Sequence, residues 1–170
     1  MTVTAVHKDA DQLTMTVDAE FEATPERVWQ LWADPRQLER WWGPPTYPAT
    51  FTTHDFRVGG RSEYFMTGPE GPTPFLGFWE ILELDPPRRM AIRDGFVESE
   101  SSPDLPGPGA MNVTIEPIGD GRTRMSIENV FPDAATMEQL LAMGQEEGMT
   151  GAVGQIDAIL AEDSVAGAAR

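Results

Sequence analysis

Alternating apolar and polar residues near the N-terminus predict a half-buried strand. Leu13, Met15, Val17, Ala19 and Phe21 share one face, and polar residues separate them over residues 13–21. This two-residue period is that of a strand with one side on a core. We therefore expect the folded core to begin at about residue 10 and the residues before it to be loose.

Two short helices are predicted directly after this strand. Thr24 is a good N-cap and Pro25 suits the first helical position, and the pair Asp34 and Pro35 repeats the same start signal. Apolar residues then recur three and four positions apart in both segments, which is the helical period. The sequence GPP from Gly43 ends the second helix.

The middle of the chain predicts six further strands separated by turns. The turn signals are VGG, TGPEGPTP, LDPPRR and IGDGRT. Residues 98–110, ESESSPDLPGPGA, predict a mobile loop rather than a domain linker, because strands resume at once. The predicted strands cover about residues 48–56, 60–67, 74–84, 88–96, 110–118 and 122–131.

The helical period returns near the C-terminus and predicts the longest helix of the chain. It begins at Pro132 or Asp133 and ends at about residue 162, and residues 163–170 form a flexible tail. Four glycines interrupt it, in the stretch GQEEGMTGAVGQ from residue 144 to 155. Each costs a helix interior roughly 0.5–1 kcal/mol relative to alanine.

The order of elements predicts an α+β fold in a single domain over residues 1–170. One antiparallel sheet with its helices on one side is the economical packing for this order. A long C-terminal helix across a curved sheet leaves a cavity wherever the facing residues are small.

Composition narrows the function classes. The chain has 170 residues, no cysteine and a formal net charge of −16. Thiolate chemistry is excluded, and nucleic acid and membrane surfaces are poor partners because both would repel this charge. With no signal peptide and no apolar run of about 18 residues, we expect a cytoplasmic protein. The excess of acidic residues indicates a general effect of solubility or genome composition. The more specific alternative is that the protein binds a cationic substrate or partner.

Four longer segments carry a family resemblance: RVWQLWADPRQLERWWGPP, RVGGRSEYFMTGPEG, GFWEILELDPPRRM and EEGMTGAVGQIDAIL. In this order and spacing they resemble the bacterial Aha1-like (activator of Hsp90 ATPase homologue 1-like) proteins of the START/Bet v 1-like (SRPBCC) superfamily, over roughly residues 10–162. The resemblance implies a helix-grip fold, in which a seven-stranded antiparallel sheet wraps around the C-terminal helix and encloses a hydrophobic ligand cavity. It implies no single activity, and no catalytic residue carries over.

A helical wheel places three of the glycines and Ala152 on one inward stripe, with Gln155 in its middle. Either the stripe leaves room for a ligand, or it packs tightly on the sheet or at a homodimer contact; we favour the ligand. Gln155 and Asn129 would then be polar groups in an apolar wall that orient the ligand. The alternative is that both side-chain amides bond to the backbone. The predicted ligand-binding residues are Trp42, Tyr47, Phe65, Trp79, Met111, Met125, Asn129, Gly144, Gly148, Met149, Ala152 and Gln155.

Catalytic and metal sites are not predicted. His7 and His54 are the only histidines and lie far apart, and no nucleophile motif is present. Phosphate-binding glycines would precede a helix and not lie within one. The leading hypothesis is a protein without cofactor that binds a small apolar molecule. The alternatives are a chaperone-interacting module, by family analogy alone, and a cyclase- or hydrolase-like enzyme on an aromatic substrate.

Overall fold

The computed structural model describes residues 3–72, 76–97 and 108–168, with side chains described up to residue 163 apart from that of Pro72. Most of the predicted 98–110 loop and the last residues of the predicted tail therefore lie outside the described residues. The strands are β1 (Val3–Asp9), β2 (Thr14–Phe21), β3 (Ala49–His54), β4 (Arg61–Gly68), β5 (Gly71–Pro72), β6 (Leu76–Asp85), β7 (Arg89–Val97), β8 (Gly109–Gly119) and β9 (Arg122–Val130). The helices are α1 (Pro25–Ala33), α2 (Pro35–Leu38), α3 (Ala134–Ala142), α4 (Gln145–Val153) and α5 (Ile156–Ala168).

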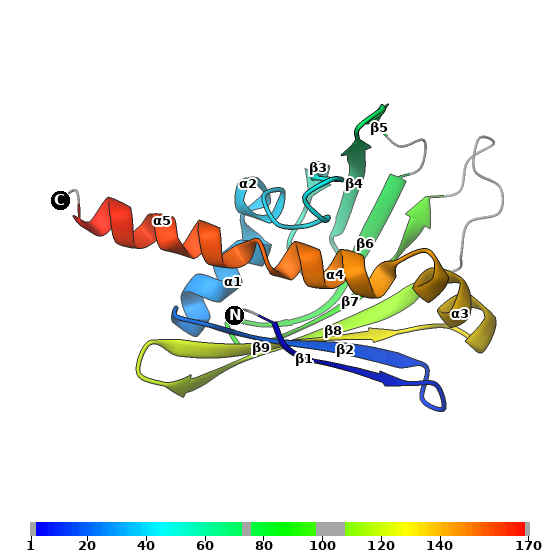
Figure 1. The fold of residues 1–170 in the computed structure, drawn as a ribbon, viewed down its shortest axis with the longest axis horizontal. Helices are drawn as coiled ribbons and strands as arrows, with labels where there is room; N and C mark the ends of the chain where they lie inside the picture. The colour runs from blue at the N-terminus through cyan, green and yellow to red at the C-terminus, as the bar shows by residue number, and fades with distance from the viewer. Residues whose placement is uncertain (1–2, 73–75, 98–107, 169–170) are drawn as a thin grey trace.

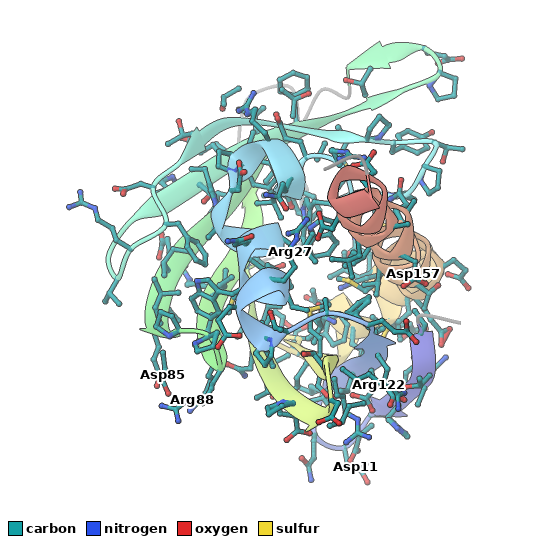
Figure 2. All side chains as sticks on the ribbon, turned by 90° about the vertical axis from the view of Figure 1, so that its left-hand side faces the viewer. Asp11, Arg27, Asp85, Arg88, Arg122 and Asp157 are labelled. Carbon is teal, nitrogen blue, oxygen red and sulfur yellow. The ribbon has the colours of Figure 1, made fainter. Side chains whose placement is uncertain are left out.

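One antiparallel sheet forms the body of the protein, in the order β1-β2-β9-β8-β7-β6-β4-β3, and β5 pairs with β4. The sheet curves, and the C-terminal helices run across its concave face (Figure 1). Seen from the end of the molecule, the strands bend around α5 and α1 (Figure 2). The α+β helix-grip fold predicted from the sequence is confirmed, and the seven predicted strands are all present.

Two strands were not predicted. β1 pairs with β2 along its length, so the expectation of a loose N-terminus is wrong. Its residues are mostly exposed or half-buried, which removes the alternation that marks a strand with one side on a core. The other unpredicted strand is β5, which has two residues.

The predicted single C-terminal helix is three helices. α3 begins after Asp133, whose carboxylate accepts from the Thr136 N–H at 2.7 Å. Gly144 separates α3 from α4 in a left-handed conformation with φ of 94°, which glycine adopts without steric cost. Gly154 and Gln155 form the turn between α4 and α5, and α5 continues past the predicted end to Ala168.

Tryptophans fill the core between α1, α2 and the sheet. Trp32, Trp41 and Trp79 have no exposed surface, and Trp32 meets Trp41 edge-on at 4.8 Å between ring centroids. Arg27 connects α1 to α5 through Asp163, with 2.6 Å between Nε and Oδ2. None of the helices among the described residues is long and apolar enough to cross a membrane.

Candidate functional site

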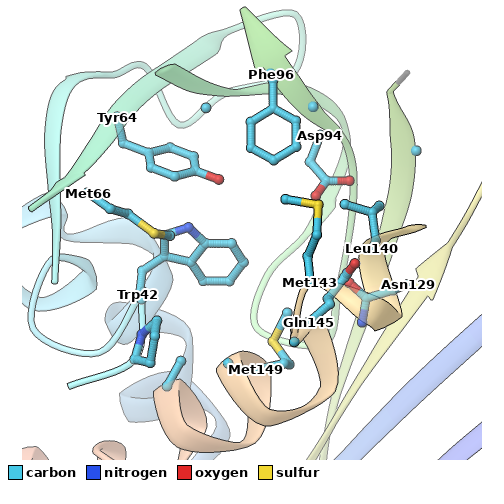
Figure 3. Close-up of a pocket in the computed structure, with 18 of the residues that line it drawn as sticks. Trp42, Tyr64, Met66, Asp94, Phe96, Asn129, Leu140, Met143, Gln145 and Met149 are labelled. Atoms are coloured by element: carbon cyan, nitrogen blue, oxygen red, sulfur yellow. The ribbon is translucent and has the colours of Figure 1, made fainter. Parts of the chain in front are cut away.

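A pocket of about 540 Å³ lies between the sheet and the α3–α4 segment (Figure 3). Its floor comes from the ends of β4, β6, β7, β8 and β9, and its walls come from the turn after α2 and from α4. The lining is mostly apolar, with aromatic rings and methionines prominent. Tyr47 and Met143, which are 41% and 61% exposed, mark its open side.

Glycines lie on both the sheet side and the helix side of the pocket. Gly77 of β6 lies under the ring of Tyr64, and a Cβ there would overlap that ring. Gly109 of β8 approaches the Val130 carbonyl so closely that a Cβ would overlap it too. On the helical side, a Cβ at Gly148 would meet no atom within 4 Å. Open space is therefore left at Gly148, whereas protein atoms occupy the space beside Gly77 and Gly109.

The four glycines of the C-terminal stretch have four different surroundings. Gly144 is the left-handed residue before α4, and Gly154 lies in the turn after it. A Cβ at Gly151 would touch Pro44 and Pro45 at 3.7 Å, which is ordinary contact. Gly148 is the one of the four beside which a Cβ would meet no atom within 4 Å, and it lines the pocket from within α4. Tight packing on the sheet therefore does not explain Gly148.

Eight predicted residues come together around the pocket. They come from the turn after α2, from β4, from β9 and from the α4 segment. They are Trp42, Tyr47, Phe65, Asn129, Gly144, Gly148, Met149 and Ala152. The helical wheel placed Gly144, Gly148 and Ala152 on this side of the helix, and a role of the eight residues in ligand binding stays a prediction.

Four predicted residues lie outside the lining. Trp79 is fully buried behind Trp42, with ring centroids 5.0 Å apart. Met125 is also fully buried, and its sulfur accepts from the Trp32 indole N–H at 3.3 Å. Met111 belongs to the same core. Their strands carry them on the inward face, but at positions that the helices cover.

Gln155 does not project into the pocket. Its Nε2 donates to the carbonyl of Gly43 at 2.8 Å and to that of Trp41 at 3.3 Å. The prediction that Gln155 faces a ligand is therefore wrong, and the alternative, an amide bonded to the backbone, is what the structure shows. Asn129 does line the pocket, yet its Nδ2 donates to the Met15 carbonyl at 3.2 Å.

Asp94, an acid on the inner face of β7, was not predicted from the sequence as a site residue. Its carboxyl points into the pocket from the wall opposite Trp42 and Tyr64 (Figure 3). Asp94 is half-buried, and desolvation by the protein atoms around its carboxyl raises the pKa of Asp94 to about 6. The strand period would have found it, because Met90 and Ile92 of the buried face lead directly to position 94.

Tyr64 is the polar neighbour of Asp94. Burial raises the pKa of the Tyr64 hydroxyl well above its usual range, the Trp42 indole opposes the rise, and the nearby Asp94 charge adds to it. The Trp42 N–H is buried, and no acceptor among the described residues meets hydrogen-bond geometry. The buried Oε1 of Gln145 likewise has no partner in the described part of the chain.

The described lining contains no histidine, lysine or arginine. His54 lies elsewhere, between the Ser62 hydroxyl and the Trp32 carbonyl, each 2.8 Å from a ring nitrogen. No group of three or more metal-ligating side chains occurs in residues 3–72, 76–97 and 108–168. The chemistry that this pocket offers is thus an apolar surface, several aromatic rings and one carboxyl group.

Comparisons with known proteins agree with this architecture. The model of the family described as activator of Hsp90 ATPase homolog 1-like protein matches residues 22–161. A protein of known solution structure from Arthrobacter aurescens is 46% identical, with a TM-score of 0.87 over 95% of this chain and 93% of that one. Protein Ms6760 from Mycobacterium smegmatis is 43% identical, with a TM-score of 0.83 over 95% and 99% of the two chains.

A more distant structure shows the same fold. The AHSA1 protein from Silicibacter pomeroyi is 20% identical, with a TM-score of 0.70 over 88% of this chain and 99% of that one. No curated protein matches the chain. The family supports a ligand-binding domain in general, and it names no ligand.

Proposed function

The chain belongs to the activator of Hsp90 ATPase homolog 1-like family, and from that premise and the pocket we propose that it binds a small apolar or amphipathic molecule. The observation that carries the proposal is the cavity of about 540 Å³ between the sheet and α4. Cavities of this size with mostly apolar walls and a few polar groups are typical of small-molecule sites. Binding would draw on the transfer of apolar surface out of water.

Gly148 provides the sharpest test, because a side chain there enters the pocket without displacing protein atoms. We expect Gly148→Leu to fill part of the cavity and to weaken binding of the neutral probe 4-phenylbutanol at least tenfold in calorimetry. The variant should remain folded, because replacing glycine within a helix gains about 0.5–1 kcal/mol in propensity.

Gly151→Ala is the matched control. It lies in the same helix but outside the lining, and its Cβ would make ordinary contacts with two prolines. It should keep wild-type affinity for 4-phenylbutanol. If Gly148→Leu binds the alcohol as tightly as the wild-type protein does, the proposal is wrong. Native mass spectrometry of the purified protein would reveal a molecule carried from the cell.

A further inference from the structure

We propose that the molecule bound in the pocket is an organic cation, with an apolar body and an ammonium group held by the Asp94 carboxyl and the aromatic rings facing it. This inference rests on the proposed function and adds the chemical class of the ligand. It goes beyond an apolar cavity, because it commits to the charge of the polar end.

The first support is the charge inventory of the pocket. Asp94 is the only charged side chain of the described lining, and no described residue forms an ion pair with it. Residues 73–75 and 98–107, outside the described part, contain no Lys, Arg or His. A carboxylate taken out of water without a cation is costly. A ligand that brings the cation removes that cost.

The other charged side chains on β7 and α4, the elements next to the pocket, point away from it or form ion pairs outside it. Arg93 is next to Asp94 but lies on the outer face of β7, where it bonds Glu80 at 2.8 Å. On α4, Glu146 pairs with Lys8 at 3.1 Å and Glu147 is exposed. None of these side chains lines the pocket. Tyr64 is the titratable residue of the lining that senses the charge of Asp94, and no cationic side chain of the described lining would compete with a bound ammonium.

The second support is the set of rings around the carboxyl. Trp42 and Tyr64 stand edge to face, with centroids 6.2 Å apart and an interplanar angle of 88°. Phe96 lies on the same strand as Asp94 and also lines the pocket (Figure 3). Aromatic faces attract alkylammonium groups through their quadrupoles, by an amount that grows when water is excluded. Rings and a carboxyl together form a site for an ammonium group, while the methionines and Leu140 offer a surface for its apolar body.

The third support is the field of the whole chain. A net charge of −16 attracts cations towards the protein and repels anions. Burial holds the pKa of Asp94 at about 6, so the carboxyl is mostly ionised above pH 7 and mostly protonated at pH 5. Since an alkylamine stays protonated over this whole range, its affinity should rise with pH as Asp94 ionises.

The test compares three probes of matched shape: 4-phenylbutylamine, 4-phenylbutanol and 4-phenylbutyrate. Calorimetry at pH 8 should show the amine binding at least tenfold more tightly than the alcohol, with the acid weakest, because a hydrogen bond to a charged group is worth more than a neutral one. The advantage of the amine over the alcohol should shrink several-fold at pH 5.

Asp94→Asn should abolish this advantage of the amine over the alcohol, together with its pH dependence. Asp120→Asn changes the net charge equally but lies in the exposed turn between β8 and β9, so it should retain the preference for the amine. An amine that binds no better than the alcohol, or a preference that survives in Asp94→Asn, overturns the inference and leaves the proposed function standing. If none of the three probes binds, the inference and the proposed function both fail.

Discussion

The side-chain amide of Gln155 donates to the carbonyl of Gly43 across 2.8 Å and so ties the turn between α4 and α5 to the turn that follows α2. The same nitrogen reaches the Trp41 carbonyl at 3.3 Å. Both carbonyls lie in the segment that carries Trp42 into the pocket. Gln155 therefore positions one wall of the site without touching the cavity.

Gln155→Met should destabilise the protein because it keeps the length of the side chain but leaves these carbonyls without their donor. We expect a loss of about 1–2 kcal/mol in the free energy of unfolding, measured by urea denaturation. Gln145→Met is the matched control, since the buried Oε1 of Gln145 has no partner in the described structure. If the two variants lose equal stability, Gln155 is not the link described above.

The glutamine pair shows how far the sequence could predict the site. The helical wheel placed Gln155 correctly on the inward stripe, but its partners are about 112 and 114 residues away along the chain. No local pattern specifies such a pair, so the wheel could not distinguish a pocket residue from a structural one. The positions of Gly148 and Ala152 were easier to predict, because they depend only on which face of the helix the two residues occupy.

The ring of Tyr64 covers Gly77, and this contact predicts a second effect on stability. Alanine normally favours a strand over glycine, but a Cβ at position 77 would overlap the ring. We therefore expect Gly77→Ala to cost about 1–3 kcal/mol, as overpacking of a core does. Thermal unfolding measures the loss.

A double-mutant cycle separates this overlap from other effects of the alanine. In a Tyr64→Ala background the ring is absent, so Gly77→Ala should cost much less than in the wild type. Equal costs in the two backgrounds would show that the ring is not the obstacle.

Asp94 predicts an unusual pH dependence of stability. Its pKa is raised from 3.8 to about 6 in the folded state, so the folded protein binds the proton more tightly than the unfolded chain. The contribution of this group to stability is greatest at low pH and is lost as pH rises through about 6. Asp94→Asn should therefore raise the free energy of unfolding at pH 8, by up to about 3 kcal/mol.

The gain of Asp94→Asn over wild type should shrink steadily as pH falls and vanish below about pH 4, where the carboxyl is protonated in both states. Urea denaturation of both proteins at a series of pH values gives the comparison. A gain that is constant with pH would mean that Asp94 is not a strained carboxylate in the free protein.

The fold was more predictable than the chemistry of its pocket. β2, β8 and β9 alternate strongly because one face of each packs on the core, and the caps at Thr24 and Asp34 mark the helices. β1 carries little of that pattern, because an edge strand with exposed sides has no apolar face to reveal it. Asp94 was missed for a different reason: the two-residue period through Met90 and Ile92 places it on the inner face, but a search for apolar residues does not select an acid.

His54 predicts a change of the opposite sign to that of Asp94. Its Nε2 donates to the Trp32 carbonyl, and its Nδ1 lies 2.8 Å from the Ser62 hydroxyl, which can donate to the neutral ring or accept from the charged one. Burial lowers the pKa of His54, and the unfolded chain therefore binds the proton more tightly. The stability that neutral His54 contributes is present above about pH 6.5 and is lost as pH falls through its lowered folded pKa.

Urea denaturation between pH 8 and pH 4.5 should show wild type losing stability relative to His54→Gln, whose amide keeps a donor for Trp32 and does not titrate. His7→Gln removes the other imidazole of the chain, from an exposed position on β1, and is the matched control. A difference between wild type and His54→Gln that is the same at every pH would rule out protonation of His54 as the cause.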